Sequence, residues 1–320
     1  MSEAPAEFKL IARHFRPLAG PGALDLLDDA AVLMPPAGRE LVISADAMVA
    51  SVHFLPDDPP DLVARKLLRT NLSDMAAMGA DSFGYLMTVS APRDTPDAWF
   101  AGFAAGLATD QAEYPVFLLG GDTTSTPGPV SLSLTILGSV APGHAIRRSG
   151  AKPGHGIWVS GTIGDGALGL LAATGRLADP TGFLGGRYRL PQPRLGLAKF
   201  GLVAACMDVS DGLIQDLGHL CRAGGVSAEI AAELVPLSEA ARAAGAAYLE
   251  RCLTGGDDYE LLMAVAPEAE AAFSRHAATV GVGVTRIGQF GAGAPAVVLR
   301  GMEGAAWEIG TGGWSHFGAG

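Results

Sequence analysis

DLVARKLLRTNLSDMAAMGA, residues 61–80, is the stretch around which the sequence can be organised. Its apolar residues recur at steps of three and four, which predicts a helix with one apolar face. Pro59 and Pro60 end the preceding segment, Asp61 can accept hydrogen bonds from the N–H groups of the first turn, and Gly79 suits the position just past a helix end. The stretch therefore predicts a core helix. The expected face consists of Ala64, Leu67, Leu68, Leu72, Met75 and Met78.

Two polar residues, Asn71 and Asp74, lie on this apolar side of the expected helix. Burying a lone carboxylate costs several kcal/mol unless a cation or hydrogen-bond donors meet it. Asp74 therefore predicts a partner. The partner is either a basic residue such as Arg65 or Arg69, or a bound metal ion.

Length and composition predict two domains and exclude several classes of protein. A chain of 320 residues exceeds the usual size of one core, and the basic, Gly/Pro-rich stretch 144–156 suggests a boundary between residues 146 and 147. No apolar run reaches the roughly 18 residues of a membrane span, and the N-terminus lacks an apolar signal region. We therefore expect a cytoplasmic protein that does not enter membranes.

The charged residues and the cysteines argue against further classes of protein. The net charge of -11 opposes nucleic-acid binding. Cys206, Cys221 and Cys252 are an odd number without C-x-x-C spacing, which argues against a disulfide framework and against zinc.

Several acids occur in or beside apolar, strand-like runs of the first half. LLDDAAVL, residues 26–33, places Asp28 and Asp29 on opposite sides of a strand, although a turn at a strand end explains them equally well. LVISADAMVASVHF, residues 41–54, predicts a strand with three notable polar side chains. These are Ser44, Asp46 and His53, and a lone histidine is more often structural than a ligand.

VFLLGGDTTS, residues 116–125, predicts a strand that breaks at its glycines. Glycines let backbone N–H groups approach a ligand closely, so Asp122 marks either a ligand site or a simple turn.

The second half repeats the combination of acids with glycines. CMDVSDGL, residues 206–213, precedes an expected helix and carries Asp208, Ser210 and Asp211, of which Asp211 belongs to a common Asp-Gly turn. Another acid pair stands in GGDDYELLMAV, residues 255–265, before an expected strand.

Gly164, Gly166 and Gly169 fit the G-x-G-x-x-G pattern of dinucleotide-binding proteins. In such proteins an acid ends a second strand about 20 residues later. The nearest candidate here is Asp179, but it lies in an expected loop over 178–193 and not at the end of a strand. The glycines therefore predict a tight turn.

Acids that gather in one place need cations. Ligation by oxygen alone suits Mg²⁺ or Mn²⁺, and Mg²⁺ beside glycine turns is what phosphoryl transfer requires. The sequence lacks the G-x-x-x-x-G-K-[ST] loop and the protein-kinase motifs. We therefore expect an ATP-using enzyme of another architecture.

The motifs DDAAVL, ISAD, NLSDMAAMGA, GGDTTS, DVSDGL and GGDDYELL resemble, in this order, those of the thiamine-monophosphate kinase family. The resemblance implies ATP-dependent phosphorylation of thiamine monophosphate to thiamine diphosphate with several Mg²⁺ ions. Sister ATPases of the same superfamily share some motifs, namely aminoimidazole ribonucleotide synthetase, selenophosphate synthetase and the hydrogenase-maturation ATPase. A nucleotide-binding regulator without turnover is a further alternative.

The resemblance also implies an α+β fold of two α/β domains, of the aminoimidazole ribonucleotide synthetase-like type. Residues 1–146 would bind ATP and Mg²⁺ and pair their sheet with that of a second copy in a homodimer. Residues 147–320 would form a mixed sheet with helices and close the active site.

The roles of single residues follow from the matching motif positions. The residues that resemble metal ligands are Asp29, Ser44, Asp46, Asp74, Asp122, Asp208 and Asp211, and among them Asp74, Asp122 and Asp208 would be catalytic. Those that resemble ATP contacts are Gly121, Asp122, Arg148 and Ser210. Those that resemble substrate contacts are His53, Asp257 and Trp314. Ala45 and Asp257 depart from the Thr and Glu that are usual in the family.

Overall fold

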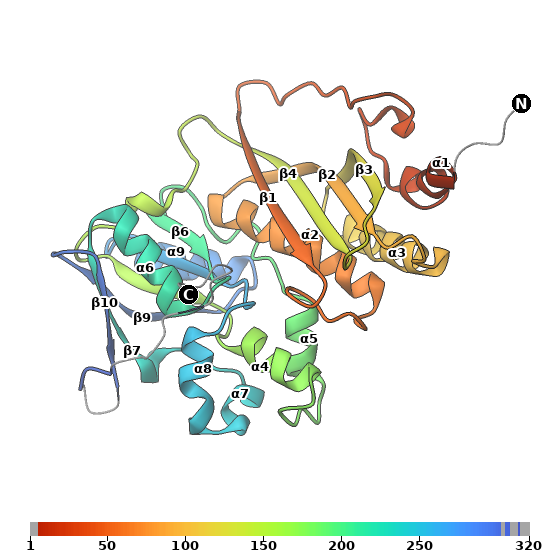
Figure 1. The fold of residues 1–320 in the computed structure, drawn as a ribbon. Helices are drawn as coiled ribbons and strands as arrows, with labels where there is room; N and C mark the ends of the chain where they lie inside the picture. The colour runs from red at the N-terminus through yellow and green to blue at the C-terminus, as the bar shows by residue number, and fades with distance from the viewer. Residues whose placement is uncertain (1–5, 302–304, 308–312, 314–320) are drawn as a thin grey trace, which may run out of the picture. The chain divides into compact units, whose positions relative to one another are not determined.

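The structure is a computed structural model that describes residues 6–301, 305–307 and 313. The chain forms two compact units (Figure 1). The first unit comprises Met1–Met75 and Ala80–Gly143, and the second comprises Ala76–Gly79 and His144–Gly320.

The first unit contains a four-stranded sheet in the order β1-β4-β2-β3, with α2 and α3 on one face (Figure 1). β2 and β3 are parallel, and the other pairs are antiparallel. Alternate residues of β4 point into the core, where Leu132, Leu134 and Ile136 are buried. The elements are α1 Ala6–Leu10, a π-helical turn Ile11–Phe15, 3-10 turns Arg16–Leu18 and Leu24–Leu26, β1 Glu40–Val49, α2 Pro60–Met78, β2 Asp81–Ala91, α3 Asp97–Glu113, β3 Phe117–Ser125 and β4 Ser131–Val140.

Helix α2 is the helix that the opening stretch predicts. It begins at Pro60, which needs no N–H partner at the first helical position, so Asp61 lies within the first turn. At the other end Gly79 has φ +68, and the N–H groups of Gly79 and Ala80 donate to the carbonyls of Ala76 and Met75. This pattern satisfies the last carbonyls of the helix, and glycine tolerates the left-handed backbone that it requires.

The second unit contains a six-stranded sheet in the order β10-β7-β9-β5-β8-β6. Only β10 and β7 are parallel among its paired strands. The elements are a 3-10 turn Arg148–Gly150, β5 Gly156–Ser160, α4 Asp165–Ala173, α5 Phe183–Arg189, β6 Ala205–Asp208, α6 Leu213–Gly224, β7 Ser227–Ala231, a 3-10 turn Ala232–Leu234, α7 Glu239–Ala244, a 3-10 turn Ala246–Tyr248, α8 Leu249–Thr254, β8 Leu261–Val265, α9 Glu270–Thr279, β9 Val284–Gly291 and β10 Ala296–Arg300.

Strand β8 carries the core of the second unit on both of its faces. Leu262 and Ala264 belong to one apolar cluster, which α6 completes with Leu217, while Met263 belongs to another, which α9 completes with Phe273. A strand buried on both faces needs a continuous apolar run rather than alternation, and the sequence LLMAV is such a run. The expected α+β fold of two α/β domains, with a mixed sheet and helices in the second, is confirmed; the first sheet is mixed as well.

One alternative is excluded, and three local predictions are wrong. Residues 27–39 form no strand, which excludes the strand alternative for Asp28 and Asp29. β1 ends at Val49, and His53 lies in a turn. β3 continues through its glycines to Ser125 because β2 pairs with it along that length. The expected loop 178–193 contains α5.

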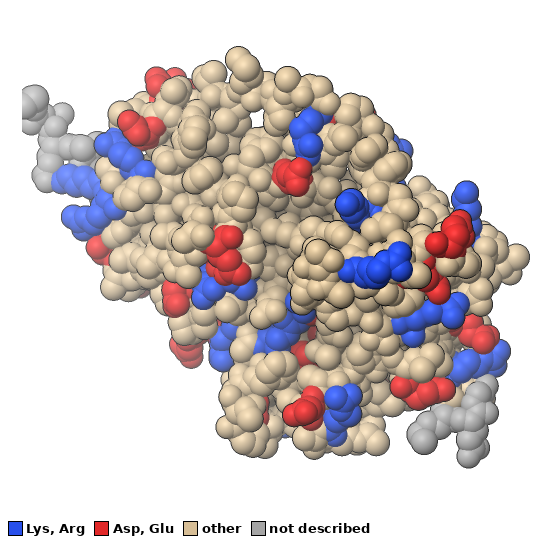
Figure 2. All heavy atoms as spheres, turned by 180° about the vertical axis from the view of Figure 1, so that it is seen from behind, with Lys and Arg blue, Asp and Glu red and all other residues tan. Residues whose placement is uncertain are grey.

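None of the helices in the described part of the chain is long and apolar enough to cross a membrane. Figure 2 shows acidic and basic side chains interspersed over the face in view, so the negative net charge is not gathered in one area of that face.

Candidate active site

Strand β1 and helix α2 bring Ser44, Asp46 and Asp74 together in the first unit. Ser44 and Asp46 share one face of β1 because residues two apart on a strand point the same way. Ser44 Oγ donates to Asp74 Oδ2 at 2.5 Å, and the Asp46 N–H donates to Asn71 Oδ1 at 3.2 Å. The polar residues that the sequence places on the apolar side of α2 therefore meet the strand.

The electrostatics of this cluster favour a cation. Burial, and next the charge of Asp74, raise the pKa of Asp46 to about 7. Arg65 and Arg69, the partners that the sequence offers to Asp74, both donate to Asp110, with Nε–O distances of 2.8 and 2.7 Å. A hydroxyl and two carboxylates form a donor set of oxygens alone, which fits Mg²⁺.

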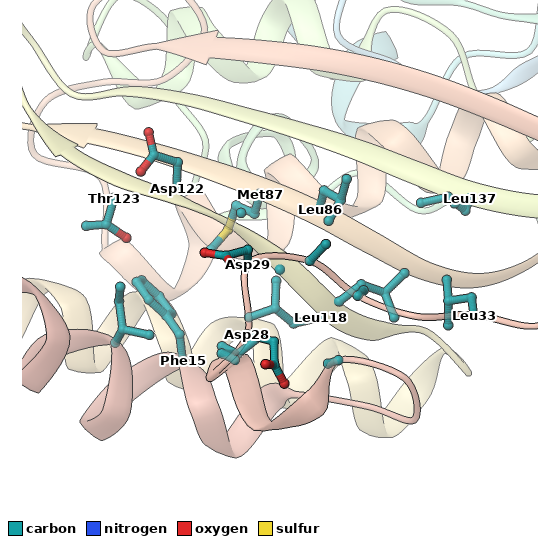
Figure 3. A pocket seen from close by; sticks show the side chains of 18 residues that line it. Phe15, Asp28, Asp29, Leu33, Leu86, Met87, Leu118, Asp122, Thr123 and Leu137 are labelled. Carbon is teal, nitrogen blue, oxygen red and sulfur yellow. The ribbon is translucent and has the colours of Figure 1, made fainter.

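A cavity of about 550 Å³ lies between the N-terminal segment and strands β2, β3 and β4 of the first unit. Figure 3 shows Asp29 and Asp122 at the same end of this cavity, with Leu33 and Leu137 toward the other end. The Asp28 carboxylate points in another direction. The cavity therefore combines an acidic end with an apolar end.

Gly121 shapes the strand at the acidic end of the cavity. A Cβ at this position would lie 1.7 Å from the carbonyl oxygen of Met87. Only glycine permits β3 to approach β2 this closely, so the pattern Gly-Gly-Asp is explained by packing within the sheet as well as by any ligand.

His53 lies in the turn after β1, where the backbone orients it. Its Nδ1 accepts from the Val49 N–H at 3.0 Å, and its carbonyl accepts from Lys66 Nζ at 2.9 Å. These contacts are those of a structural histidine, and a role in substrate binding stays a prediction.

In the second unit, the loop after β6 lies beside the loop before β8. Asp208 ends β6 and is buried. The Asp257 N–H donates to the Ser210 carbonyl at 2.9 Å, and the Tyr259 N–H donates to the Val209 carbonyl at 2.9 Å. The structure thus places the predicted ATP contact Ser210 next to the predicted substrate contact Asp257.

Three side chains around the start of α6 form a second group that could hold a metal ion. The ligand atoms of Asp211, Asp216 and His219 all lie within 4.8 Å of one another. Asp216 Oδ2 accepts from the N–H groups of Asp211 and Gly212 at 3.1 Å each, and burial raises its pKa to about 7. Burial and then the charges of Arg222 and Arg148 lower the pKa of His219, so the predicted ATP contact Arg148 is near this group.

The sequence prediction missed Asp216 and His219. A signal was available for Asp216, because it shares the buried face of α6 with Leu213, Leu217 and Leu220. An acid among apolar residues at helical spacing is the same signal that identifies Asp74. Trp314, the third predicted substrate contact, lies outside the described residues.

The sequences of both units match family models of AIR synthase related proteins. The N-terminal domain model matches residues 27–140, and the C-terminal domain model matches residues 152–300. Among solved structures, thiamine-monophosphate kinase from Stenotrophomonas maltophilia K279a is 37% identical, with a TM-score of 0.83, over 94% of this chain and 98% of that chain. AaThiL complexed with AMPPCP and TMP is 28% identical, with a TM-score of 0.77, over 91% of each chain.

The sequence is also similar to curated enzymes along most of its length. Thiamine-monophosphate kinase of Caulobacter vibrioides is 48% identical over 300 residues, which are 89% of this chain and 84% of that protein. Two matched domains and this identity identify the family, and the chain belongs to the thiamine-monophosphate kinases.

Proposed function

We propose that this protein transfers the γ-phosphate of ATP to thiamine monophosphate and forms thiamine diphosphate. The observation that carries this proposal is the 48% identity to a thiamine-monophosphate kinase over 89% of the chain. The complex of AaThiL with TMP and the ATP analogue AMPPCP, which this chain matches over 91% of its length, supports the same pair of substrates.

Magnesium is the metal that the residues present fit best. In the first unit the oxygens of Ser44, Asp46 and Asp74 would hold it, together with Asp29 and Asp122 at the cavity. In the second unit Asp208 and Asp211 would do so, and Asp216 and His219 are close enough to Asp211 to assist. Bound Mg²⁺ would neutralise the negative charge of the phosphates.

The protein residues have to bind and orient two anions rather than remove a proton. A phosphate monoester has its second pKa near 6, so the acceptor oxygen is already largely unprotonated at pH 7 and needs no strong general base. We assign Arg148, Gly121 and Ser210 to ATP, and His53, Asp257 and Trp314 to the substrate. Among the acids, Asp74, Asp122 and Asp208 carry the catalytic role by positioning charge.

The outer face of the first sheet supports a homodimer. Residues of β1 that point away from α2 include Leu41 and Ile43, which are 45% and 60% exposed. Leu86 of β2 and Phe117 of β3 are 42% and 40% exposed. The N-terminal segment covers part of this face at the cavity, which Leu86 lines. The apolar side chains that stay exposed indicate an interaction surface, and we propose that a second copy of the chain covers it.

A product assay tests the function. Purified protein with ATP, Mg²⁺ and thiamine monophosphate should yield thiamine diphosphate by chromatography, and removal of Mg²⁺ with EDTA should stop the reaction. ADP release with an aminoimidazole ribonucleotide precursor or selenide, but not with thiamine monophosphate, would identify a sister ATPase instead. ATP binding without turnover on any of these substrates would identify a regulator.

A further inference from the structure

The loop that presents Asp257 has an unusual backbone. Asp257 and Tyr259 have φ values of +71 and +52, in the left-handed region that side chains other than glycine rarely adopt. Between them Asp258 is 1% exposed, so the chain turns this acid inward while Asp257 and Tyr259 are half-buried. Surrounding contacts must hold such a conformation in place.

The Asp258 carboxylate provides these contacts at the start of α4. Its Oδ2 accepts from the Gly164 N–H at 2.6 Å, and its Oδ1 accepts from the Gly166 N–H at 2.9 Å. The first N–H groups of a helix lack partners within the helix and carry a partial positive charge. The carboxylate therefore satisfies two of these donors and fixes the loop against the helix.

Close backbone packing leaves this loop little freedom around the carboxylate. A Cβ at Gly166 would lie 2.2 Å from the Asp257 carbonyl oxygen, and a Cβ at Gly256 would lie 2.0 Å from the Ser210 carbonyl oxygen. On the other side, Arg187 Nη2 donates to the Asp258 carbonyl at 3.4 Å and to Glu260 Oε1 at 2.8 Å.

We propose that Asp258 is a positioning residue, whose buried carboxylate holds Asp257 in the orientation that binds thiamine monophosphate. This inference rests on the proposed function, in which Asp257 contacts the substrate. It assigns the N–H groups of the first two glycines of the G-x-G-x-x-G stretch to a carboxylate of the same chain. Asp258 acts through the loop and does not touch the substrate.

The test compares Asp258→Asn with a matched control, Asp165→Asn. The Asn variant keeps one acceptor but presents an amide to the other N–H, so one of the two hydrogen bonds is lost. Asp165 is also fully buried in the first turn of α4, but its carboxylate accepts from the hydroxyls of Ser238 and Thr162 and pairs with Arg187 Nε at 4.0 Å. The control therefore removes a buried charge that also contacts Arg187, while both hydrogen bonds from Asp258 to α4 are kept. A general loss of stability at this helix would affect both variants alike.

Two measurements separate the inference from the proposed function. Hydrogen exchange of a peptide that covers residues 255–260 should be about tenfold faster in Asp258→Asn and unchanged in Asp165→Asn. In Asp258→Asn the KM for thiamine monophosphate should rise about tenfold, with the KM for ATP within twofold of wild type, as expected for the loss of one buried hydrogen bond. In an Asp257→Ala background the same substitution should change the KM for thiamine monophosphate less than twofold.

Each outcome decides one of the two claims. Unchanged hydrogen exchange in Asp258→Asn would show that Asp258 does not restrain the loop. Faster exchange with an unchanged KM, or an equal effect on KM in the Asp257→Ala background, overturns positioning through Asp257. Faster exchange in Asp258→Asn, together with a wild-type protein that does not phosphorylate thiamine monophosphate, overturns the proposed function and leaves the restraint of the loop by Asp258 standing.

Discussion

At the scale of single residues, the pair Asp46 and Asp74 has the strongest chemical requirement. Their mutual repulsion and the burial of Asp46 disfavour two negative charges without a cation. Arg65 and Arg69 form ion pairs with Asp110. These ion pairs also explain how α3 can bury this acid.

We predict that Asp74→Asn removes turnover and leaves the fold intact, because it deletes a charge at nearly constant volume. The measurements are thiamine diphosphate formation and circular dichroism. Asp57→Asn, at an exposed position between β1 and α2, serves as the control and should retain activity. Wild-type turnover in Asp74→Asn would show that Asp74 has only a structural role.

We also predict that metal-free protein loses stability as the pH rises from about 4 to 7, in part through Asp46. The folded pKa of Asp46, about 7, is higher than the ordinary value of 3.8 for an aspartate. The folded state therefore holds this proton more tightly, and the stabilising contribution is full below pH 4 and is lost as the pH passes the folded pKa.

Urea unfolding in EDTA at pH 5 and pH 8 tests this linkage. Asp46→Asn should lose less stability between these pH values than wild type, by on the order of a few kcal/mol. Asp216 contributes a dependence of the same sign in both proteins, so the difference isolates Asp46. Equal losses in the two proteins would contradict the prediction.

Single residues were predictable where an acid interrupts an apolar pattern. That signal identifies Asp74 in α2, and it would also have identified Asp216 in α6. It fails for His219, because a histidine on a helix has no characteristic spacing relative to acids that the chain brings close only after folding.

At the scale of elements, β3 shows how one glycine determines the pairing of two strands. Gly121 lies against the Met87 carbonyl, whereas a Cβ at its neighbour Gly120 would meet Leu86 Cδ2 at an ordinary 3.5 Å. The two adjacent glycines therefore have different structural requirements.

We predict that Gly121→Ala lowers the free energy of unfolding by about 3 kcal/mol or more, since the backbone oxygen of a paired strand cannot move aside cheaply. Gly120→Ala should change it by less than about 1 kcal/mol. Denaturant unfolding without nucleotide measures both. Similar values for the two variants would show that β3 can shift relative to β2.

Elements were predictable where the hydrophobic period is regular, as in α2 and in the apolar run of β8. The extent of β3 was not predictable, because its glycines read as a break, and only the pairing with β2 keeps them extended. Helix α5 was missed for a related reason. Its sequence FLGGRYR contains two adjacent glycines, and tertiary contacts, including those of Arg187 with Glu260, stabilise it.

At the scale of the whole molecule, the fold class followed from motifs that are spread over almost the entire chain. The composition also indicated two domains. That residues 76–79 at the end of α2 group with the second unit was not visible in the sequence, since the helical pattern continues through them without interruption.

We predict a homodimer with about twice the chain mass of 32.6 kDa. Ile43→Lys should give a monomer, because a charge would be buried where the second copy covers the apolar side chains of β1. Leu234→Lys, at a 49% exposed apolar residue of the second unit, should leave the mass unchanged. Sedimentation equilibrium measures all three proteins, and a wild-type monomer at micromolar concentration would refute the prediction.

The contact between Asp258 and the start of α4 has an evolutionary consequence. Gly164 and Gly166 precede their acceptor by 94 and 92 positions, and both donate through backbone N–H groups, which every residue except proline has. Loss of the acid therefore leaves two buried donors without this partner, whereas the glycines are required by packing: a Cβ at Gly164 would lie 2.3 Å from Cys252 Cβ, and a Cβ at Gly166 would lie 2.2 Å from the Asp257 carbonyl oxygen. Homologues that lack the acid should therefore still have glycine at position 166.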